Sequence, residues 1–307
     1  MLHRPRFNIY DYAKSNNQVK KYFLIFLLGF VYCSTFKADA RSLKLTSWNI
    51  EWLVSSQDSF SLPEDIVFRQ RKDFDRLASY VKQLNADIIG LQEIGSIATL
   101  QQLFPADNYQ ILLTNDSIPQ HVGLAIRKGL HFERHPDLTA LNVYRADAHH
   151  PLRSGLDITL YRFKIPLRLL IIHLKSGCQD YPLDKSSHSC PILKTQLLVL
   201  KNWIQERIKN HEAFILMGDF NRVLSLQDPF FKTLSSDIPL FMPSFGFANP
   251  CWGGSFFIDG FLISDQAKTF IVPNSLRVMI YKEQDRIQKK FIIRSLSCFY
   301  KITRFLR

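Results

Sequence analysis

Polar side chains able to do chemistry recur in this chain at the ends of short apolar runs. In chain order they are Asn49, Glu51, Glu93, His173, Lys175, Asp219, Asn221 and Asp259. Carboxylate and amide oxygens are the ligands that hard cations such as Mg²⁺, Mn²⁺ and Ca²⁺ prefer. A zinc site is disfavoured, because the sequence has neither C-x-x-C nor H-E-x-x-H spacing. The pattern predicts a divalent-cation site at which a carboxylate positions water for attack on an anionic ester.

Each of these residues, taken alone, has a simpler explanation. Glu51 or Glu93 alone is a solvated acid at the end of a strand, and His173 alone is a structural histidine. Asp219 and Asn221 alone are turn formers. Their recurrence at the ends of successive apolar runs is what favours a single shared site.

Such a site needs a scaffold that brings several strand ends together. Apolar spacing predicts helices over 71–85 and 192–210. Strands are predicted over 43–53, 87–94, 109–115, 121–128, 155–163, 167–176, 213–221 and 256–264. Several strands alternate apolar and polar residues, as antiparallel strands with one covered face do. With no repeat and no linker, the chain is predicted to be an α/β protein with two packed mixed sheets flanked by helices.

The net charge of +12 is concentrated at the two ends of the chain. Residues 1–40 carry +4 and residues 286–307 carry +7, which leaves +1 for residues 41–285. The high isoelectric point therefore does not indicate a nucleic-acid partner, because backbone binding depends on clustered Lys and Arg.

The N-terminal residues resemble an export signal. Lys20 and Lys21 precede the apolar run "YFLIFLLGFVYCSTF", and Ala38-Asp39-Ala40 supplies an A-x-A cleavage site. Residues 1–40 are therefore predicted to be a signal peptide cleaved near Ala40, with the mature chain secreted or periplasmic. The alternative is an uncleaved anchor, although the run is short against the roughly 20 residues that a membrane span needs.

Five cysteines are present, of which Cys178, Cys190 and Cys251 lie between the predicted signal and the C-terminal tail. In an exported chain, Cys178 and Cys190 are predicted to close a short loop as a disulfide. The alternative is a pair of free or metal-binding thiols. Cys251 would be left over.

Five motifs resemble, in order, those of the endonuclease/exonuclease/phosphatase superfamily, to which deoxyribonuclease I belongs. They are "SWNIEWL", "DIIGLQEI", "IIHLKSG", "LMGDFN" and "FIDGFLIS", and the resemblance runs from Leu43 to Ile263. It implies a four-layered, DNase I-like α/β-sandwich. It also implies hydrolysis of phosphate esters with Mg²⁺, or with Mn²⁺ or Ca²⁺.

The resemblance also implies a role for each matching residue. Glu93 resembles the main metal ligand, with Asn49 beside it and Glu51 at an acidic position that some members add to the metal shell.

A second group resembles the catalytic residues of the family. His173 resembles the histidine that protonates or clamps the scissile phosphate, and Asp219 resembles the carboxylate that orients or deprotonates water. Asn221 would donate its amide to a phosphate oxygen, and Arg153 resembles an arginine near the phosphate. Gln120 stands where some relatives carry the acid that orients the histidine. An amide can hold the His173 ring but cannot stabilise its cationic form.

The last motif of the family, S-D-H-x-P, is missing. Its histidine normally pairs with the aspartate at the position of Asp259. Here "ISDQAKTF" (263–270) comes too early and has Gln266 in place of the histidine, and no histidine follows His211. Asp259 is therefore predicted to lack its partner.

The tail over 286–307 is interpreted as out of frame. One permitted codon choice for Ile292–Leu306 reads, in the neighbouring frame, LSDHYPVSIKLQDF followed by a stop. That translation restores the motif and an alternating strand. We therefore assign 41–285 to the enzyme domain and 286–307 to an aberrant tail that leaves neighbouring strands unpaired. The alternative is a genuine basic tail, such as a membrane-surface helix.

The sequence thus predicts an exported, monomeric, metal-dependent phosphodiesterase, impaired as written. A DNase-like endonuclease acting on nucleic acid is expected first, because His173 resembles that branch. A sphingomyelinase-like enzyme or a phosphatase of phosphoinositides, acting on phospholipid or inositol phosphate, is second. From a different class, a non-catalytic remnant that binds a phosphate ligand stays open.

Overall fold

The computed structural model describes residues 42–58, 62, 64, 66–144, 151–187, 189–250 and 256–281, together with the backbone of 299–305. Ser42–Arg307 form one compact unit. The predicted signal over 1–40, Cys251 and the stretch 286–298 lie outside the described residues. No helix in the described part of the chain is long and apolar enough to cross a membrane.

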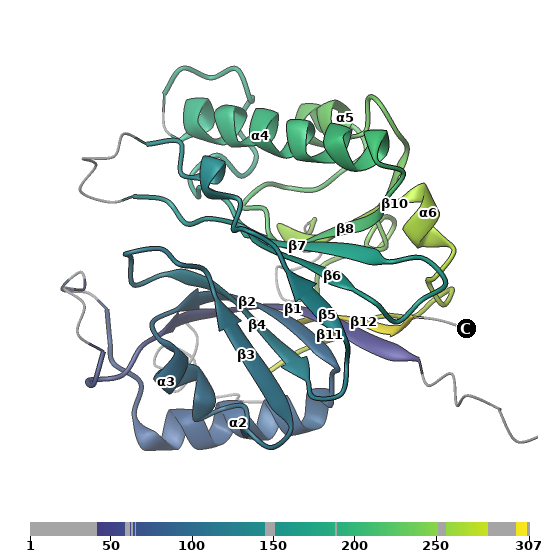
Figure 1. Cartoon of the computed structure of the whole chain (residues 1–307). Coiled ribbons are helices and arrows are strands. Elements are labelled where there is room, and N and C mark those ends of the chain that lie inside the picture. The colour runs from purple at the N-terminus through teal and green to yellow at the C-terminus, as the bar shows by residue number, and fades with distance from the viewer. Residues whose placement is uncertain are drawn as a thin grey trace, which may run out of the picture. The chain divides into compact units, whose positions relative to one another are not determined.

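Two six-stranded mixed sheets pack face to face (Figure 1). The first has the order β11 (Leu276–Met279), β12 (Phe299–Phe305), β1 (Leu43–Leu53), β2 (Ile88–Ile94), β4 (His121–Arg127) and β3 (Tyr109–Leu113). The second has the order β5 (Phe132–Arg134), β6 (Leu156–Leu160), β7 (Leu167–His173), β8 (Ala213–Asp219), β10 (Asp259–Ser264) and β9 (Leu240–Phe241).

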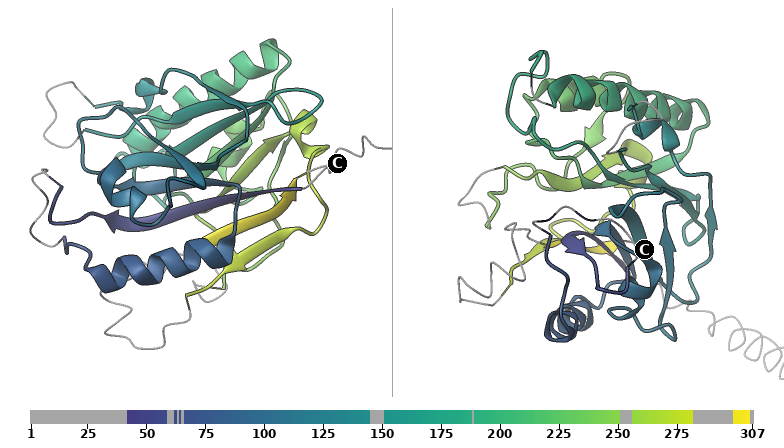
Figure 2. Two further views of the ribbon diagram at one scale, coloured as in Figure 1. Left: turned by 60° about the horizontal axis from the view of Figure 1, so that its bottom comes forward. Right: turned by 90° about the vertical axis from the view of Figure 1, so that its left-hand side faces the viewer.

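Helices cover the outer face of each sheet, which completes four layers (Figures 1 and 2). The helices α2 (Arg71–Leu84) and α3 (Ile97–Gln101) cover the first sheet, and α4 (Cys190–Lys209) and α5 (Pro229–Leu234) cover the second. The short α6 (Asp265–Lys268) and the 3₁₀ turn η1 (Thr139–Leu141) lie on connections. The predicted DNase I-like four-layered sandwich is confirmed.

Apolar side chains from both sheets fill the space between them. Leu45 and Ile88 from the first sheet belong to the same fully buried cluster as Ile171, Ile215 and Met217 from the second. Separate clusters join the outer faces to α2 and to α4. The two sheets are thereby held face to face, and the ends of their central strands meet at one rim.

The predicted strands and helices are all present, with ends shifted by a few residues. The short β5, β9 and β11 were not predicted, because two to four residues are too few to show a period.

The C-terminal tail supplies a strand, contrary to our expectation that it would leave its neighbours unpaired. The backbone of β12 pairs antiparallel with β1 and with β11, so it lies between them within the first sheet (Figure 2). Backbone pairing depends little on side-chain identity, so a tail of unexpected sequence can still occupy a strand position. Whether this tail is out of frame stays a prediction.

We expect Gly218→Ala to disrupt the second sheet. Gly218 has a φ of +140°, and a Cβ there would lie 2.0 Å from the carbonyl oxygen of Ile172 on β7. Neither the backbone angle nor the contact can be relieved without separating β7 from β8. Circular dichroism melts should show a loss of several degrees or no folded protein. The matched control is Gly260→Ala, whose Cβ would meet Leu224 at an ordinary 3.4 Å. Equal melting of the two variants would contradict the prediction.

Candidate active site

All eight residues of the predicted metal-binding and catalytic set line one cavity of about 270 Å³. They are Asn49, Glu51, Glu93, Arg153, His173, Asp219, Asn221 and Asp259. Gln120, Trp52, Ser176, Gln179 and Ile258 complete the lining. The structure thus brings together residues that are up to about two hundred positions apart in the chain.

Parallel strand pairs at the centre of each sheet explain this convergence. In the second sheet β7 and β8 run parallel and end with His173 beside Asp219. The antiparallel β10 begins at the same level, with Asp259 opposite Asp219. In the first sheet β1 and β2 are parallel, and Asn49 pairs with Gln92, the residue before Glu93. Carboxyl ends of parallel strands share one edge of a sheet, so these side chains meet there.

The backbone is left-handed at several points around the cavity. Glu51, Trp52, Glu93 and Asn221 have φ values of 53°, 49°, 65° and 48°. Register shifts occur in the same places, between Asn49 and Leu53 of β1 and between Leu91 and Ile94 of β2. Bulges of this kind turn a side chain away from the regular alternation of a strand. Non-glycine residues rarely adopt such angles, and those that do are concentrated at active sites and ligand-binding sites.

Asn49 joins the acidic side chains of the two sheets. Its Nδ2 donates to Glu93 Oε1 and to Asp219 Oδ2, both at 3.0 Å. Its Oδ1 accepts from the backbone N–H of Glu51 at 2.9 Å, and the other Glu93 oxygen accepts from the Trp52 N–H at 3.1 Å. The amide thus lies between two carboxylates that would otherwise face each other directly.

Two buried carboxyl groups in the cavity hold their protons more tightly than usual. Burial raises the pKa of Asp219 to about 6, although hydrogen bonds from Asn49 and from the Asn221 N–H act in the opposite direction. Burial also raises the pKa of Asp259 well above its ordinary value, and the charges of Asp219 and Glu93 add to this effect. No hydrogen bond to the Asp259 carboxylate comes from the described residues. Whether Asp259 lacks a partner in the whole chain stays a prediction, because the side chains of the C-terminal tail lie outside the described residues.

The His173 ring is buried and is not held by Gln120. Burial lowers the pKa of His173 well below its usual value, and Arg153 and Lys175 act in the same direction. Nε2 lies 3.7 Å from Glu93 Oε1 and from Asp219 Oδ2, too far for a hydrogen bond. Nδ1 is buried and has no hydrogen-bond partner in the described part of the chain. The expectation that Gln120 could orient this ring is wrong, because its oxygen accepts from Arg153 Nη1 at 3.4 Å instead.

Arg153 supports the end of β7. Its Nε donates to the carbonyl oxygen of His173 at 2.9 Å and its Nη2 donates to that of Leu174 at 2.8 Å. Asn221 Nδ2 also donates to Leu174 O, at 3.0 Å. The predicted role of both side chains was contact with a phosphate oxygen. In the structure they fix the backbone that carries His173.

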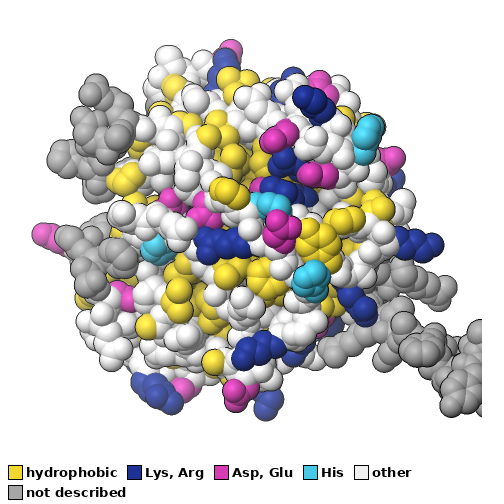
Figure 3. Space-filling model, viewed as in Figure 1, with side chains coloured by type: hydrophobic (Ala, Val, Ile, Leu, Met, Phe, Trp, Pro, Cys, Tyr) yellow, Lys and Arg dark blue, Asp and Glu magenta, His cyan; other side chains and the backbone are white. Residues whose placement is uncertain are grey.

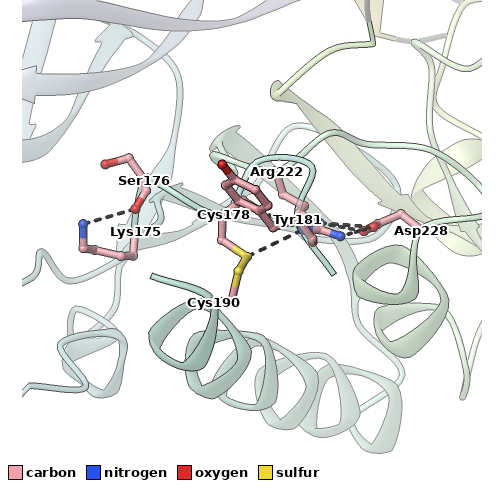
Figure 4. The surroundings of a disulfide bond; sticks show 7 residues. All are labelled: Lys175, Ser176, Cys178, Tyr181, Cys190, Arg222 and Asp228. Carbon is pink, nitrogen blue, oxygen red and sulfur yellow. Dashed lines mark hydrogen bonds and ion pairs between the residues drawn. A yellow bond between two sulfur atoms is a disulfide. The ribbon is translucent and has the colours of Figure 1, made fainter. Parts of the chain in front are cut away.

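A disulfide closes a loop beside the cavity (Figure 4). Cys178 and Cys190 are bonded, as predicted, with their Cα atoms 5.0 Å apart. Buried Arg222 pairs with Asp228 and donates to the carbonyl oxygens of Cys178 and Tyr181, at 2.7 Å and 2.6 Å. These contacts hold the loop that contributes Ser176 and Gln179 to the cavity lining.

Ser176, Gln179, Trp52 and Ile258 were missed by the sequence analysis. Ser176 and Gln179 lie close in sequence to Cys178, so the predicted disulfide was the signal that could have found them. Trp52 and Ile258 adjoin Glu51 and Asp259, but an apolar residue next to a strand end carries no chemical signal of its own.

The donor set suits a hard cation, although it is not arranged as a finished metal site. Among the described residues no group of three His, Cys, Asp or Glu side chains is spaced to hold a metal ion. Glu51, Glu93, Asp219 and Asp259 nevertheless put four carboxyl groups into one cavity, and burial raises the pKa of Asp219 and Asp259. A bound divalent cation would relieve this unfavourable concentration of negative charge. Glu93, Asn49 and Glu51 are the residues that could hold it on the side of the first sheet.

A model of the Endonuclease/Exonuclease/phosphatase family matches residues 46–261, more than two thirds of the chain. The matched range contains every residue of the cavity lining. A comparison with curated protein sequences finds no match.

Solved structures show the same fold at low sequence identity. A humanized D. rerio TDP2 matches with a TM-score of 0.57 and 17% identity, over 87% of this chain and 99% of the other. TDP2 from C. elegans gives a TM-score of 0.56 and 17% identity, over 86% and 75%. A mannosyl-6-phosphatase from Bacteroides thetaiotaomicron gives 0.50 and 15%, over 87% and 100%. At such identities the likeness establishes the fold alone.

We expect Glu93→Gln to weaken binding of Mn²⁺ by about tenfold or more, because it removes the carboxylate between the Asn49 amide and the Trp52 N–H. Isothermal titration of the purified chain measures this. Glu64→Gln, which changes an exposed acid on the connection from β1 to α2, should leave Mn²⁺ binding unchanged. Equal affinity of the Glu93 variant and the unmodified chain would contradict the assignment.

Without metal, the buried carboxyl groups should make the fold less stable as pH rises. A folded-state pKa above the ordinary value means that the unfolded chain releases protons first. The contribution of these carboxyl groups to the stability of the fold is therefore most favourable below about pH 4. It falls as pH rises toward the folded-state pKa, which is about 6 for Asp219. We expect Asp259→Asn to reduce this fall and to raise the Tm in EDTA at neutral pH by about 2–4 °C. Melts in EDTA between pH 4 and pH 8 measure it, and an unchanged slope in the variant would show that Asp259 is not a source of the effect.

Proposed function

The chain belongs to the endonuclease/exonuclease/phosphatase family, and on that premise we propose that it is a divalent-metal-dependent hydrolase of phosphodiesters. The observation that carries the proposal is the cavity in which Glu93, Asp219 and Asp259 from both sheets meet around Asn49. Buried acids gathered without a matching cation are costly to the fold, and they are common where a protein binds a metal for catalysis.

The cation we propose is Mg²⁺, with Mn²⁺ or Ca²⁺ as substitutes, held by Glu93, Asn49 and Glu51. When bound, it would offset the negative charge of the phosphate and of the pentacovalent state. Asn49 would exchange its present contacts for this role, since its Nδ2 now donates to both carboxylates and its Oδ1 accepts from the Glu51 N–H.

Asp219 is suited to activate water. Its Oδ1 accepts from the Asn221 N–H at 2.7 Å, which fixes the carboxylate, and its pKa of about 6 lets it accept a proton near neutral pH. The oxygen of the attacking water would form the new bond to phosphorus while the bond to the leaving oxygen breaks. Neutral His173 can donate one hydrogen bond to a phosphate oxygen, and Arg153 holds its backbone in place.

We also propose that the chain is exported and acts as a monomer. The apolar run before Ala40 supports export, and so does a disulfide that an oxidising compartment would preserve. The out-of-frame reading of the tail stays part of this proposal, because it would return a histidine to the partner position of Asp259.

The sequence suggested nucleic acid as the first substrate, and this assignment depends on the resemblance of His173 alone. The proteins of similar fold include both TDP2 and a mannosyl-6-phosphatase. Similarity of fold to such different proteins does not indicate which phosphate ester this chain hydrolyses. The surface around the cavity is more informative about the substrate class and is treated below.

We predict that a frame-restored chain hydrolyses a generic phosphodiester, such as bis-p-nitrophenyl phosphate, only with added Mg²⁺ or Mn²⁺. The chain as written should be slower by about 10²–10⁴-fold, because it lacks a histidine opposite Asp259. Rates of both proteins with and without EDTA measure this. Equal turnover of the two chains would remove the frame interpretation. Metal-independent turnover, or none with any phosphate ester, would remove the proposed function.

A further inference from the structure

Exposed apolar side chains occur in segments that adjoin the cavity lining. Eleven large hydrophobic side chains are exposed in the described part of the chain, and seven of them lie close in the chain to cavity-lining residues or to residues beside these. These seven are Val67, Phe68, Ile97, Tyr181, Phe245, Phe247 and Phe256. Single exposed apolar residues are ordinary, but several in neighbouring segments mark an interaction surface.

The chain path ties four of these residues to the cavity on the side of the second sheet. Phe256 precedes the lining residue Ile258 by two positions, and Tyr181 follows Gln179 by two. Phe245 and Phe247 follow Ser244, whose hydroxyl lies about 4.0 Å from where a Cβ of Gly260 would be. Phe245, Phe247 and Phe256 are 58%, 55% and 60% exposed.

Apolar residues also stand on the opposite side of the cavity. Val67 and Phe68 adjoin Arg69, which donates to the carbonyl oxygen of the lining residue Glu51. Ile97 opens α3, directly after the end of β2 that carries Glu93. Both sheets therefore contribute to what we name the apolar rim, the seven residues given above.

The same connections carry no excess of positive charge. We consider the described parts of 54–70, 95–100, 114–120, 142–155, 174–189, 220–228 and 242–258. They contain the five basic residues Arg69, Arg153, Lys175, Lys185 and Arg222 against the six acidic residues Asp58, Glu64, Asp116, Asp180, Asp184 and Asp228.

The three arginines of this set are engaged by the backbone of the protein itself. Arg69, Arg153 and Arg222 are buried, and each donates to backbone carbonyl oxygens. Only Lys175 and Lys185 remain as partly exposed cations on the described connections. On the face shown in Figure 3, Lys and Arg side chains are likewise dispersed among acidic ones.

We propose that the apolar rim docks the chain onto the surface of a lipid bilayer, so that the cavity opens toward the phosphodiester of a phospholipid headgroup. The naming of phospholipid as substrate rests on the proposed phosphodiesterase function, whereas the docking itself does not. Aromatic and aliphatic side chains that project around a polar cavity can enter the boundary between headgroups and acyl chains.

Charge decides between a bilayer and a nucleic acid. A nucleic acid presents a dense row of phosphates, and binding it depends on several Lys and Arg contacts that release counterions. Two partly exposed lysines with an equal or greater number of acids do not supply such a surface. A zwitterionic bilayer makes no such demand, because the burial of apolar side chains supplies the binding energy.

Vesicle cosedimentation tests the proposal directly. The probe is a unilamellar vesicle of pure phosphatidylcholine in EDTA, so that neither metal nor turnover is required. The chain from Arg41 onward should be used, because the apolar run at 22–36 would itself bind lipid and Ser42–Arg307 form a compact unit. We expect the chain to bind, and 0.5 M NaCl to leave binding unchanged, because docking is apolar. Binding only to vesicles that contain phosphatidylserine, lost in salt, would assign it to the basic tail and overturn the proposal.

The variant F245S/F247S/F256S should bind phosphatidylcholine vesicles at least tenfold more weakly. V67S/F68S, on the opposite side of the cavity, should also weaken binding and serves as a second variant if the first does not fold. The matched control is Y161S/I165S, which removes two exposed apolar side chains from the far turn between β6 and β7. Equal loss in the control, or no loss in either rim variant, would overturn the proposal.

A parallel binding measurement with a DNA duplex tests nucleic acid as the alternative partner. Salt-sensitive DNA binding that the rim variants lose, without vesicle binding, would make the rim a base-stacking surface and overturn lipid docking. Vesicle binding without hydrolysis of any phosphodiester by the frame-restored chain would keep the docking surface and remove the proposed function instead.

Discussion

The burial of acidic side chains, with repulsion among them as a smaller addition, is the constraint on which this cavity depends. Glu93, Asp219 and Asp259 share a space of about 270 Å³, and the described residues offset their charge mainly through the Asn49 amide and backbone N–H groups. Burial raises the pKa of Asp219 and Asp259, and neighbouring acidic charges add to the rise. A protein that gathers acids in this way gives up stability for a site that attracts a cation. The remaining features of the rim can be understood as ways to hold that arrangement.

The sheets impose the arrangement through their backbones. The two central pairs of parallel strands, β1 with β2 and β7 with β8, end at the same level. The bulges at Glu51 and Glu93 turn acidic side chains inward. On the other side, Arg153 and Asn221 donate to the carbonyl oxygens after β7, so their polar groups secure the strand that carries His173. The disulfide and Arg222 hold the adjoining loop in the same manner. Much of the polar chemistry at the rim therefore positions neighbouring groups.

The sequence predicted those features that depend on local patterns of apolar and polar residues. Alternating and continuous apolar runs located the strands that bear Asn49, Glu93, His173 and Asp219, and the resemblance of their motifs to a known family implied the DNase I-like fold. Local patterns could not predict side-chain contacts between segments that are distant in the chain. The Gln120 oxygen meets Arg153 and not His173, and Arg153 meets backbone carbonyls, because side-chain partners depend on the packed geometry. Ser176 and Gln179 lie on an irregular loop with no period. The strand β12 escaped prediction because its residues form neither a clean strand pattern nor a helical one, and pairing with β1 and β11 decides its conformation.

The position of β12 has a consequence for the order in which the chain can acquire its structure. Leu43 pairs with Phe305, so the first strand of the fold and the last one are neighbours in the same sheet. Until β12 has paired, β1 has only β2 beside it, and its other edge lacks a mate. Pairings of such sequence separation form late and slowly. A folding chain therefore passes through a stage with an unpaired edge in its first sheet, when chaperones, proteases or other unfolded chains can compete for that edge.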